Sequence, residues 1–582
     1  MGSRSDTGVS AQSVIFAGCL RNVEMHLKDV LANCERLSET MQKKFFVFAE
    51  NDSTDNTRAI LQDWRASREN VHVFCCDGLD IKMPHRTQRL AFLRNRILGL
   101  VIELGLSDYD MLCLMDFDEV NAGEIEPNDF HAATEFLFSR LNHAGVFAVS
   151  DPIYYDIWAL RHPKWCPNDC WLEVGKALNK ADAIKRVVME RQIPIYRDHA
   201  PIPVNSAFGG LGLYKTSFAL KAVNAYIGLN KDGDETCEHV SFNEAIVKAG
   251  GNLYVFPALR NSTPPGYLVG NGQHKTIRLS GISGLGEIVL IAPPSHLLDQ
   301  YLQAHPLYDR RLPLLLDTFN RIAGKVSLLD IGCNILDTIA LIKLNGVSIS
   351  RSISVDASLE FYKYAIFNAK NNPAYFDNCE ILWGFVGAAE DCGNIAAENG
   401  TGSVRHMHHS HRCDDLNDLL APQQVTFSDL AKTGVDVVKT DLDGYDQKAL
   451  LQNMEWLLRF KPIIWAEANI DDADDVSAWG DILLRLTDEF PYVAVFDNFG
   501  FCVCVGLLAE KINVVLELIA IGARYRAYAG THGAPRLYYV DIMLCPRRFE
   551  SVFQAFIFRL PETAPLKRKA TVDLSMSNPD IS

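Results

Sequence analysis

The sequence predicts an α/β protein built from two doubly wound domains in succession. Apolar strand-like runs alternate with periodic helical segments twice, from Val14 to about Gln273 and from about Val326 to Phe558. The chain has 582 residues, more than the roughly 250–300 residues that a single core supports. In open α/β sheets ligands bind beyond the carboxyl ends of the strands. The polar residues at those ends are therefore the first candidates for function.

Composition narrows the class of protein. Apolar residues make up 48% and charged residues 22% of the chain, as in ordinary globular proteins. The formal charge of −16 argues against bulk affinity for nucleic acid or anionic membranes. No apolar run approaches the roughly 20 residues needed to span a bilayer. Fifteen cysteines, mostly in apolar strands, suit free thiols in a reducing compartment, so we expect a cytoplasmic protein, peripheral at the inner membrane only through its substrate.

The first half opens with a strand–helix alternation. Residues 13–18 and 45–49 read as apolar strands separated by a periodic helix from Glu24 to Thr40. A second helix, from Thr57 to Trp64, precedes another strand at residues 71–76. The second strand delivers acids into a turn, of which Glu50 stands directly at the strand end, where a carboxylate can accept hydrogen bonds from a base or ribose.

A second acidic strand end follows in the stretch LCLMDFDEV, residues 112–120. The simple interpretation is a strand leaving the core through a polar turn. The alternative is a site in which Asp116 and Asp118 bind a hard divalent cation, which would neutralise charge on a departing nucleotide diphosphate. A D-x-D pair alone is weak evidence, and Glu119 stays unassigned.

The first half resembles the GT-A glycosyltransferases, and more narrowly the capsule-associated (α-1,3-)mannosyltransferase family and its bacterial relatives. The segments that carry the resemblance span nearly the whole half: AENDSTDNT (49–57), RTQRLAFLRNR (86–96), DFDEV (116–120), YDIWALR (155–161) and CEHVSFN (237–243). The resemblance implies a GT-A-like nucleotide-sugar fold, Mn²⁺ or Mg²⁺ at Asp116 and Asp118, a donor such as GDP-mannose, and a glycan or lipid-linked glycan acceptor.

The arginine-rich segment before the acidic strand predicts a helix. Arg89 and Arg96 lie seven residues apart and share a face. A guanidinium can pair with a diphosphate or with the metal-binding carboxylates, although a solvated basic face is the simple alternative. The resemblance favours Arg89 and Arg94 as donor-binding residues.

The resemblance also assigns roles later in the first half. Asp156, Trp158 and Arg161 match the sugar-facing segment, although Trp158 could equally be a core residue. Glu238 falls where an acid deprotonates the acceptor hydroxyl, but His239 replaces the acid that usually follows. His274 is a candidate late ligand for metal or phosphate.

The second half reads as a ligand-binding turn followed by an acidic strand end. Residues 328–337, LLDIGCNILD, form a strand that enters a helix through a turn containing glycine, and Asp356 ends the next strand. This is the layout of an adenosine site, with close backbone approach at the turn and an acid for the ribose. A nicotinamide dinucleotide would fit the turn but not the later segment from Lys439 to Asp446.

This half resembles the FkbM-type S-adenosylmethionine-dependent methyltransferases. The matching segments are FNAKNN (367–372), VTFSDL (425–430), VVKTDLDGYD (437–446) and IIWAE (463–467). The resemblance implies a Rossmann-like fold that binds S-adenosylmethionine through Asp330, Gly332, Asn334, Asp356 and Asp443. It implies that Asp441 and Lys439 orient and deprotonate a sugar hydroxyl, although a buried ion pair is the simple alternative.

Three departures from that family pattern leave the activity open. Leu336 replaces a second glycine, where a Cβ could crowd the methionine end of the cofactor, and Asp356 and Asp443 replace glutamates. The histidine-rich segment 405–413 is interpreted as a polar loop rather than a metal site.

The predicted organisation is a glycosyltransferase domain (1–275), a connector (276–325), a methyltransferase domain (326–560) and a disordered tail (561–582). The predicted function is a bifunctional glycan-assembly enzyme, compatible with a homo-oligomer and without nucleic-acid or integral membrane partners. It combines metal-dependent glycosyl transfer with O-methylation of a sugar hydroxyl. The alternative is a glycan-assembly scaffold in which the second domain is a degenerate, non-catalytic module.

Overall fold

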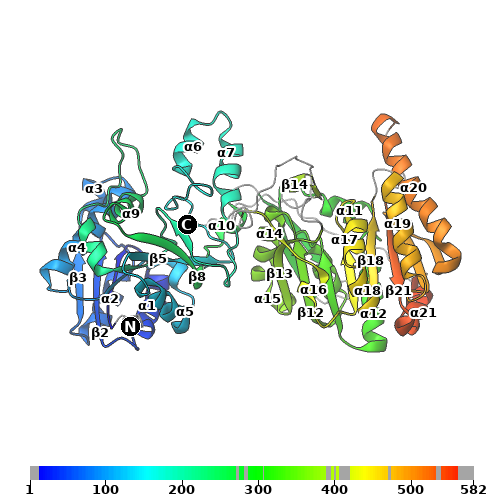
Figure 1. Cartoon of the computed structure of the whole chain (residues 1–582), viewed down its shortest axis with the longest axis horizontal. Coiled ribbons are helices and arrows are strands. Elements are labelled where there is room, and N and C mark those ends of the chain that lie inside the picture. The colour runs from blue at the N-terminus through cyan, green and yellow to red at the C-terminus, as the bar shows by residue number, and fades with distance from the viewer. Residues whose placement is uncertain are drawn as a thin grey trace, which may run out of the picture. The chain divides into compact units, whose positions relative to one another are not determined.

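The chain divides into two compact units, Met1–Gly270 and Asn271–Ser582 (Figure 1). This computed structural model describes residues 12–560, apart from 271–273, 281–285, 306, 388–394, 399–400, 405–419, 470–472 and 533–538. The predicted tail and the histidine-rich segment 405–413 lie outside the described residues. Within these ranges, no helix is both long and apolar enough to cross a membrane.

The first unit follows the alternation that the sequence predicts. Its helices and strands are β1 (Ser13–Leu20), α1 (Glu24–Leu37), β2 (Lys43–Glu50), α2 (Thr57–Ala66), β3 (Val71–Cys75), α3 (Leu79–Lys82), α4 (Arg86–Glu103), β4 (Met111–Met115), α5 (Pro127–Phe138), β5 (His143–Asp151), α6 (Cys170–Lys176), α7 (Lys180–Val187), β6 (Ile202–Val204), β7 (Leu211–Lys215), α8 (Thr216–Ala219), α9 (Glu238–Lys248), β8 (Asn252–Ser262) and α10 (Gly266–Val269).

These strands form one eight-stranded sheet in the order β3-β2-β1-β4-β7-β5-β8-β6. The first four strands are parallel, so β2 and β4 end at the same edge. The sheet is mixed rather than mainly parallel beyond that point, because β7 pairs antiparallel with both β4 and β5. The acids that follow β2 and β4 are thereby brought to one edge, as the sequence predicts.

Helices cover both faces of this sheet. On one face, Phe16, Phe46 and Phe48 pack with side chains of α1, α2 and α5, because alternate residues of a strand point to the same side. On the other face, α4 lies against β1 and β2 and contacts α9. The position of α4 is important for function because it carries the four arginines singled out in the sequence.

The second unit contains the remaining elements. They are β9 (Lys275–Ser280), β10 (Glu287–Ala292), α11 (Leu298–Ala304), α12 (Arg311–Ala323), β11 (Val326–Ile331), α13 (Asp337–Leu344), β12 (Ile349–Asp356), α14 (Leu359–Asn371), α15 (Pro373–Phe376), β13 (Cys379–Phe385), β14 (Ile395–Glu398), β15 (Thr401–Val404), β16 (Gln423–Gln424), α16 (Phe427–Leu430), β17 (Val437–Thr440), α17 (Asp446–Gln452), α18 (Met454–Phe460), β18 (Ile463–Ala468), α19 (Ala473–Leu486), β19 (Tyr492–Asp497), β20 (Cys502–Leu507), α20 (Leu508–His532), β21 (Val540–Cys545) and α21 (Glu550–Arg559).

The main sheet of this unit has the order β16-β13-β12-β11-β17-β18-β21-β19-β20. The strands from β16 to β18 are parallel, whereas β21 is antiparallel to both of its neighbours, β18 and β19. Side chains of α16 to α20 pack on one face of the sheet. On the other face, α12 lies against β11 and α21 packs on α12 and β19. The second unit is therefore also an α/β sheet with helices on both faces.

Residues 276–325, predicted as a connector, contain a hairpin and two helices of this second unit. The strands β9 and β10 pair antiparallel. Asn368 on α14 fixes the hairpin, because its side chain accepts a hydrogen bond from the Ile291 amide and donates one to the Ile291 carbonyl. The same amide nitrogen donates to the carbonyl of Ile335, so the hairpin is joined to the turn that follows β11.

The turn after β11 has an unusual backbone. Gly332, Asn334 and Leu336 have φ values of +80°, +49° and +69°, in the left-handed region that costs most residues other than glycine about 1–2 kcal/mol. Leu336 therefore occupies a conformation that favours the glycine expected there. Its side chain is completely buried, so it packs into the core.

We predict that the usual order of stability is reversed at Leu336. Both Leu336→Ala and Leu336→Gly lose buried packing, at a cost of about 2–5 kcal/mol, but only glycine relieves the left-handed backbone. Leu336→Gly should therefore be about 1 kcal/mol more stable than Leu336→Ala in chemical denaturation. Leu341, equally buried within α13, is the control position: there the alanine variant should be the more stable one by about 1 kcal/mol.

Candidate active sites

The acids of the first unit project from the loop after β4. Asp116 donates its backbone N–H to the Gly210 carbonyl (2.8 Å), and the Asp118 side chain accepts from the Val120 amide (3.1 Å), which starts a short 3₁₀ turn, Glu119–Asn121. Phe117, between the two acids, is buried and packs edge-on against Phe48 at 4.9 Å. Because the buried ring anchors the loop, the two acids are left at the edge of the sheet.

A pair of glycines just before β7 supports this loop. Gly209 and Gly210 both have positive φ, and a Cβ at Gly210 would lie 2.7 Å from Val120. The Asn121 side chain donates to the carbonyls of Asp116 (2.9 Å) and Gly210 (2.7 Å). These residues were not predicted, although two adjacent glycines just before a strand are a signal of close backbone approach.

Arg94 is the buried cation of this site. Its side chain lies 3.1 Å from the Asp116 carboxylate and forms an ion pair with Glu238, the first residue of α9. Burial opposes the charged guanidinium, but its acidic neighbours, Asp116 foremost, more than offset this and raise the pKa of Arg94. Arg94 thus joins α4, β4 and α9. Glu238 is 3% exposed and lies in this ion pair, and its role as acceptor base stays a prediction.

The surroundings of Asp116 and Asp118 disfavour the charged forms of their carboxyl groups. Burial raises the pKa of Asp118 to about 7, and the neighbouring charge of Asp116 adds to this. Burial also raises the pKa of Asp116, against the effect of Arg94. The charge of Arg86, at the exposed start of α4, lowers both pKa values. No hydrogen bond or ion pair of the Arg86 guanidinium occurs within the described residues, so this cation is available beside the acids.

Two predicted donor-binding residues are engaged elsewhere. Arg89 donates to the carbonyls of Met83 (2.8 Å) and Pro84 (2.7 Å), which fixes the turn before α4. Glu50 is completely buried and pairs with Arg58, with 2.7 Å between its Oε2 and the arginine Nε. The structure therefore gives both residues structural contacts.

The predicted sugar-facing segment divides into two parts. Asp156 accepts a hydrogen bond from the Gly209 amide (3.0 Å). Burial of the Tyr267 ring raises the pKa of Tyr267, and the charge of Asp156 adds to this rise. Trp158 and Arg161 instead both donate to the Asp169 carboxylate, each at 3.0 Å. Asp156 therefore borders the glycine pair, whereas Trp158 and Arg161 form a cross-link to the start of α6.

Tyr155, from the predicted sugar-facing segment, forms an aromatic pair with Tyr267, which the sequence did not single out. Tyr155 contacts Tyr267 with 4.8 Å between the ring centroids, and Tyr267 is 44% exposed. Burial of the Tyr155 ring raises the pKa of Tyr155, and the charges of Asp116 and Asp118 contribute to this rise. An exposed aromatic ring near acids can stack on a base or sugar.

His274 belongs to the second unit. Its ring Nδ1 lies 3.0 Å from the Tyr364 hydroxyl, and the two rings meet edge to face. The structure thus gives this histidine a partner on α14, and the metal role predicted for it stays untested.

In the second unit, the turn after β11 lies close to the backbone of Asp441, and the approach to a ligand that the sequence predicts there stays a prediction. A Cβ at Gly332 would lie 1.9 Å from the Asp441 carbonyl oxygen, so only glycine fits. The carboxylate of Asp356 accepts from the amides of Asn334 and Ser358, both at 2.8 Å. Burial raises the pKa of Asp356 to about 7 despite these hydrogen bonds. Asp356 therefore shapes the turn that it was predicted to complete.

Lys439 forms the buried ion pair that the sequence left as the alternative to catalysis. Its Nζ lies 3.1 Å from Asp330 and 3.5 Å from Asp441, and it donates to the Gly332 carbonyl at 2.8 Å. Asp330 has no exposed surface, and burial raises its pKa to about 6 although Lys439 opposes the rise. Lys439, paired with Asp330, thus fixes the glycine turn through its hydrogen bond to the Gly332 carbonyl.

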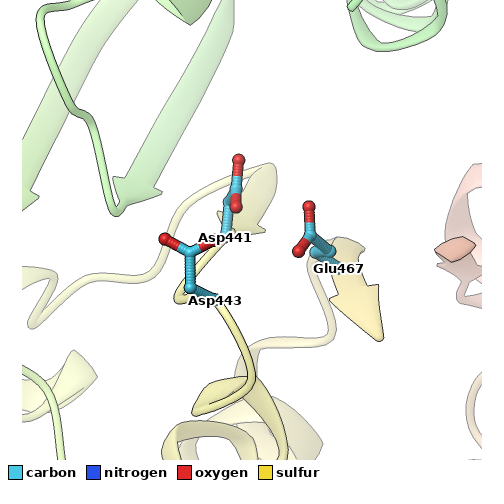
Figure 2. Close-up of side chains that lie close together, drawn as sticks. All are labelled: Asp441, Asp443 and Glu467. Carbon is cyan, nitrogen blue, oxygen red and sulfur yellow. The ribbon is translucent and has the colours of Figure 1, made fainter. Parts of the chain in front are cut away.

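A third acid joins Asp441 and Asp443 at the edge of this sheet. Oxygens of Asp441, Asp443 and Glu467 all lie within 4.8 Å of one another (Figure 2). The register explains this proximity, because Thr440 on β17 pairs with Ala466 on β18, which places the following residues, Asp441 and Glu467, side by side. Glu467 was not predicted as a site residue, since the register of two strands cannot be read from either strand alone.

The comparisons with known proteins give distant structural similarity and no family. A mannosyltransferase from Pyrobaculum calidifontis with GDP-Man and Mn²⁺ is 12% identical, with 45% of this chain and 59% of that chain covered and a TM-score of 0.27. TarS of S. aureus, residues 1–349, is 13% identical (44% and 62% covered, TM-score 0.26). Glucosyl-3-phosphoglycerate synthase of M. tuberculosis, with Mn²⁺, UDP-Glc and phosphoglyceric acid, is 11% identical (43% and 68% covered, TM-score 0.22).

The similarity spans about three fifths of the length of the first two of these structures. No family model and no curated protein matches the chain. Functional conclusions therefore rest on the geometry of the two sites.

We predict that the metal-free protein loses stability as the pH rises from about 4 to 7. The carboxyl group of Asp118 has a pKa of about 7 when folded and an ordinary value of 3.8, so the folded state binds the proton more tightly and is favoured at low pH. Asp118→Asn should reduce this dependence and stabilise the protein by about 1–2 kcal/mol at pH 8. Thermal melts in EDTA between pH 4.5 and 8 test this, and parallel pH profiles of the two proteins would contradict it.

Proposed function

We propose that the first unit is a nucleotide-sugar-dependent glycosyltransferase that uses a divalent cation at Asp116 and Asp118. The observation that carries this proposal is the arrangement at the end of β4. Two carboxylates follow β4 at the sheet edge, the buried Arg94 pairs with Asp116, and the charge of the exposed Arg86 lowers the pKa of both acids. The arrangement combines a cation site with a positive side chain for phosphate, which is what departure of a nucleotide diphosphate requires.

The residues fit a hard cation. Both candidate ligands are carboxylates, which Mg²⁺ and Mn²⁺ prefer. Burial and the neighbouring charge of Asp116 both disfavour charge on Asp118 and raise its pKa, an effect that a bound cation would offset. When bound, such an ion supplies charge neutralisation for the leaving diphosphate.

The side chains around the acids have separate roles in this proposal. Arg86 binds the diphosphate, and Tyr267 stacks on the base or sugar. Asp156 holds the glycine pair against the donor. Glu238, paired with Arg94, is the candidate base for the acceptor hydroxyl.

For the second unit we propose S-adenosylmethionine-dependent O-methylation of a sugar. Counted along the chain from β11 and without the two edge strands, the strand order is 3-2-1-4-5-7-6 with an antiparallel seventh strand. This order is compatible with the Rossmann-like methyltransferase fold that the sequence resemblance implies. Gly332 lets the turn after β11 pack against the Asp441 carbonyl, which keeps the turn tight at the carboxyl edge of the sheet, and Asp356 at the end of β12 would hold the ribose. When bound, S-adenosylmethionine supplies the methyl group.

The residues of this chain would prepare the acceptor hydroxyl. Asp441 is half-exposed, with 44% of its side chain accessible, and lies where it can accept a proton. Lys439 positions Asp441 and the glycine turn without reaching solvent itself. On this proposal Lys439 is a positioning residue.

We predict that Mn²⁺-dependent release of nucleoside diphosphate from a nucleotide sugar depends on Asp116 and Arg86. A panel of nucleotide sugars with a glycan acceptor measures it. Asp116→Asn should lower the rate by roughly 100-fold or more. Arg86→Ala should weaken donor binding by roughly 10–100-fold through loss of one charge-assisted hydrogen bond.

Arg96→Ala is the control on the same helix, because Arg96 pairs with Glu103 at the surface, and it should behave as wild type. Activity of Asp116→Asn equal to that of wild type would disprove the metal site.

We predict that Gly332→Ala abolishes S-adenosylmethionine binding in calorimetry, because its Cβ would displace the Asp441 carbonyl. Gly324 is the matched control: it also has positive φ (+91°), but nothing lies within 4 Å of an added Cβ. Gly324→Ala should cost about 1–3 kcal/mol of stability, because its backbone conformation (φ +91°, ψ −153°) favours glycine, and should keep the affinity. Failure of the wild type to bind the cofactor would instead favour a non-catalytic second unit.

A further inference from the structure

Three neighbouring strands in the second unit bring acids together at one edge of the sheet, namely the carboxyl ends of β17 and β18 and the amino end of the antiparallel β21. Asp441 follows β17, Glu467 lies on β18, and Asp541 on β21 pairs with Glu467 in register. All three line one cavity, which Asp309 also borders. Four carboxylates therefore share a small space.

The cations that line this cavity offset these acids only in part, because the one lysine that lies 3.5 Å from Asp441 is shared with Asp330. Lys439 pairs with the fully buried Asp330, and its Nζ donates to the Gly332 carbonyl. Arg311 donates to the Gly500 carbonyl at 2.6 Å. The acids thus carry more negative charge than their neighbours neutralise.

Glu467 provides a second, independent indication of a ligand. Glu467 is 7% exposed. Its carboxylate forms no hydrogen bond or ion pair with the described part of the chain. Figure 2 shows this carboxylate directed to the same region as those of Asp441 and Asp443. An unpaired buried acid aimed at two others is costly unless something binds it.

We propose that Asp441, Asp443 and Glu467 bind a divalent cation in the second unit. The site contains only carboxylate oxygens, so it would take a hard ion such as Mn²⁺, Mg²⁺ or Ca²⁺. Two oxygens on one ion lie at most about 4.0–4.2 Å apart for Mg²⁺ and about 4.6–5.2 Å for Ca²⁺. The present oxygen separations, within 4.8 Å, suit the larger ions directly and Mg²⁺ after a small approach.

The local backbone supports this assignment of Asp443. It has φ +47° and is followed by Gly444 at +98°, so two consecutive residues adopt left-handed conformations that turn the loop back toward β18. Asp446 fixes the turn by accepting from the Leu442 amide at 3.0 Å. Strain of this kind is found where a site is held ready for a ligand.

The cation would bind and acidify a sugar hydroxyl during methyl transfer. That role rests on the proposed function of the second unit, but binding of the ion does not. The new site also changes the assignment of Asp443, which the sequence resemblance gave to the cofactor.

The test is Mn²⁺ binding to the full-length protein, measured by the electron paramagnetic resonance signal of free Mn²⁺. The double variant Asp116→Asn/Asp118→Asn removes the proposed site of the first unit and should still bind one ion per chain. Adding Glu467→Gln to it should abolish this binding or weaken it at least tenfold. Glu510→Gln, at an exposed glutamate of α20, is the control and should leave binding unchanged.

The folding of the Glu467→Gln variant is checked by thermal melting, without an activity assay. In EDTA, Glu467→Gln should melt at or above the temperature of wild type, because an unpaired buried charge is replaced by an isosteric amide, but it should lose the stabilisation that Mn²⁺ gives the parent. Unchanged Mn²⁺ binding in Glu467→Gln, or no binding to the Asp116→Asn/Asp118→Asn parent, would overturn the proposal. Calorimetry with S-adenosylmethionine alone reports separately on the proposed function.

Discussion

Burial of carboxylates at the carboxyl ends of parallel strands is the constraint that both units must meet. A carboxylate removed from water needs a counter-charge, hydrogen-bond donors or a proton. The first unit uses Arg94, 6% exposed, and the second uses Lys439, 5% exposed. Each cation also joins separate parts of its unit: Arg94 connects α4 with β4 and α9, and Lys439 connects β17 with β11 and the glycine turn. The geometry of each site therefore depends on one buried positive charge.

The two cations suit their positions for different reasons. The planar guanidinium of Arg94 can pair with two carboxylates from different elements, Asp116 and Glu238, in fixed directions. The ammonium of Lys439 is a compact charge with three donors, which match an acid, a backbone carbonyl and a second acid around it. Exchanging the two residue types would leave at least one acid of each set without its partner.

The sequence predicts the positions of the acids better than it predicts which residues pair with them. Asp116 and Asp118 could be located because an apolar run ends in them and the sheet edge follows from the fold class. The choice among the arginines of α4 was harder, because spacing defines faces of a helix but not which face meets the sheet. Of the two arginines that the resemblance favoured, Arg89 is held by the turn before α4, whereas Arg94 pairs with Glu238 of α9. Two strand-end glutamates show the same limit: Glu50 is neutralised by Arg58, and Glu467 gains its neighbours only through strand register.

The charge balance at the two edges distinguishes the two proposed cation sites. In the first unit Arg94 offsets Asp116, and Arg86 further reduces the negative field, so phosphate oxygens would be needed to complete a strong cation site there. In the second unit Lys439 is shared between Asp330 and Asp441, so a single ammonium serves the edge that also carries Asp443 and Glu467, with Asp541 on the same cavity. Coulomb attraction in a partly buried cavity then favours a divalent ion without any phosphate. A cation in the first unit should accordingly bind together with the nucleotide, whereas one in the second unit should bind before any substrate.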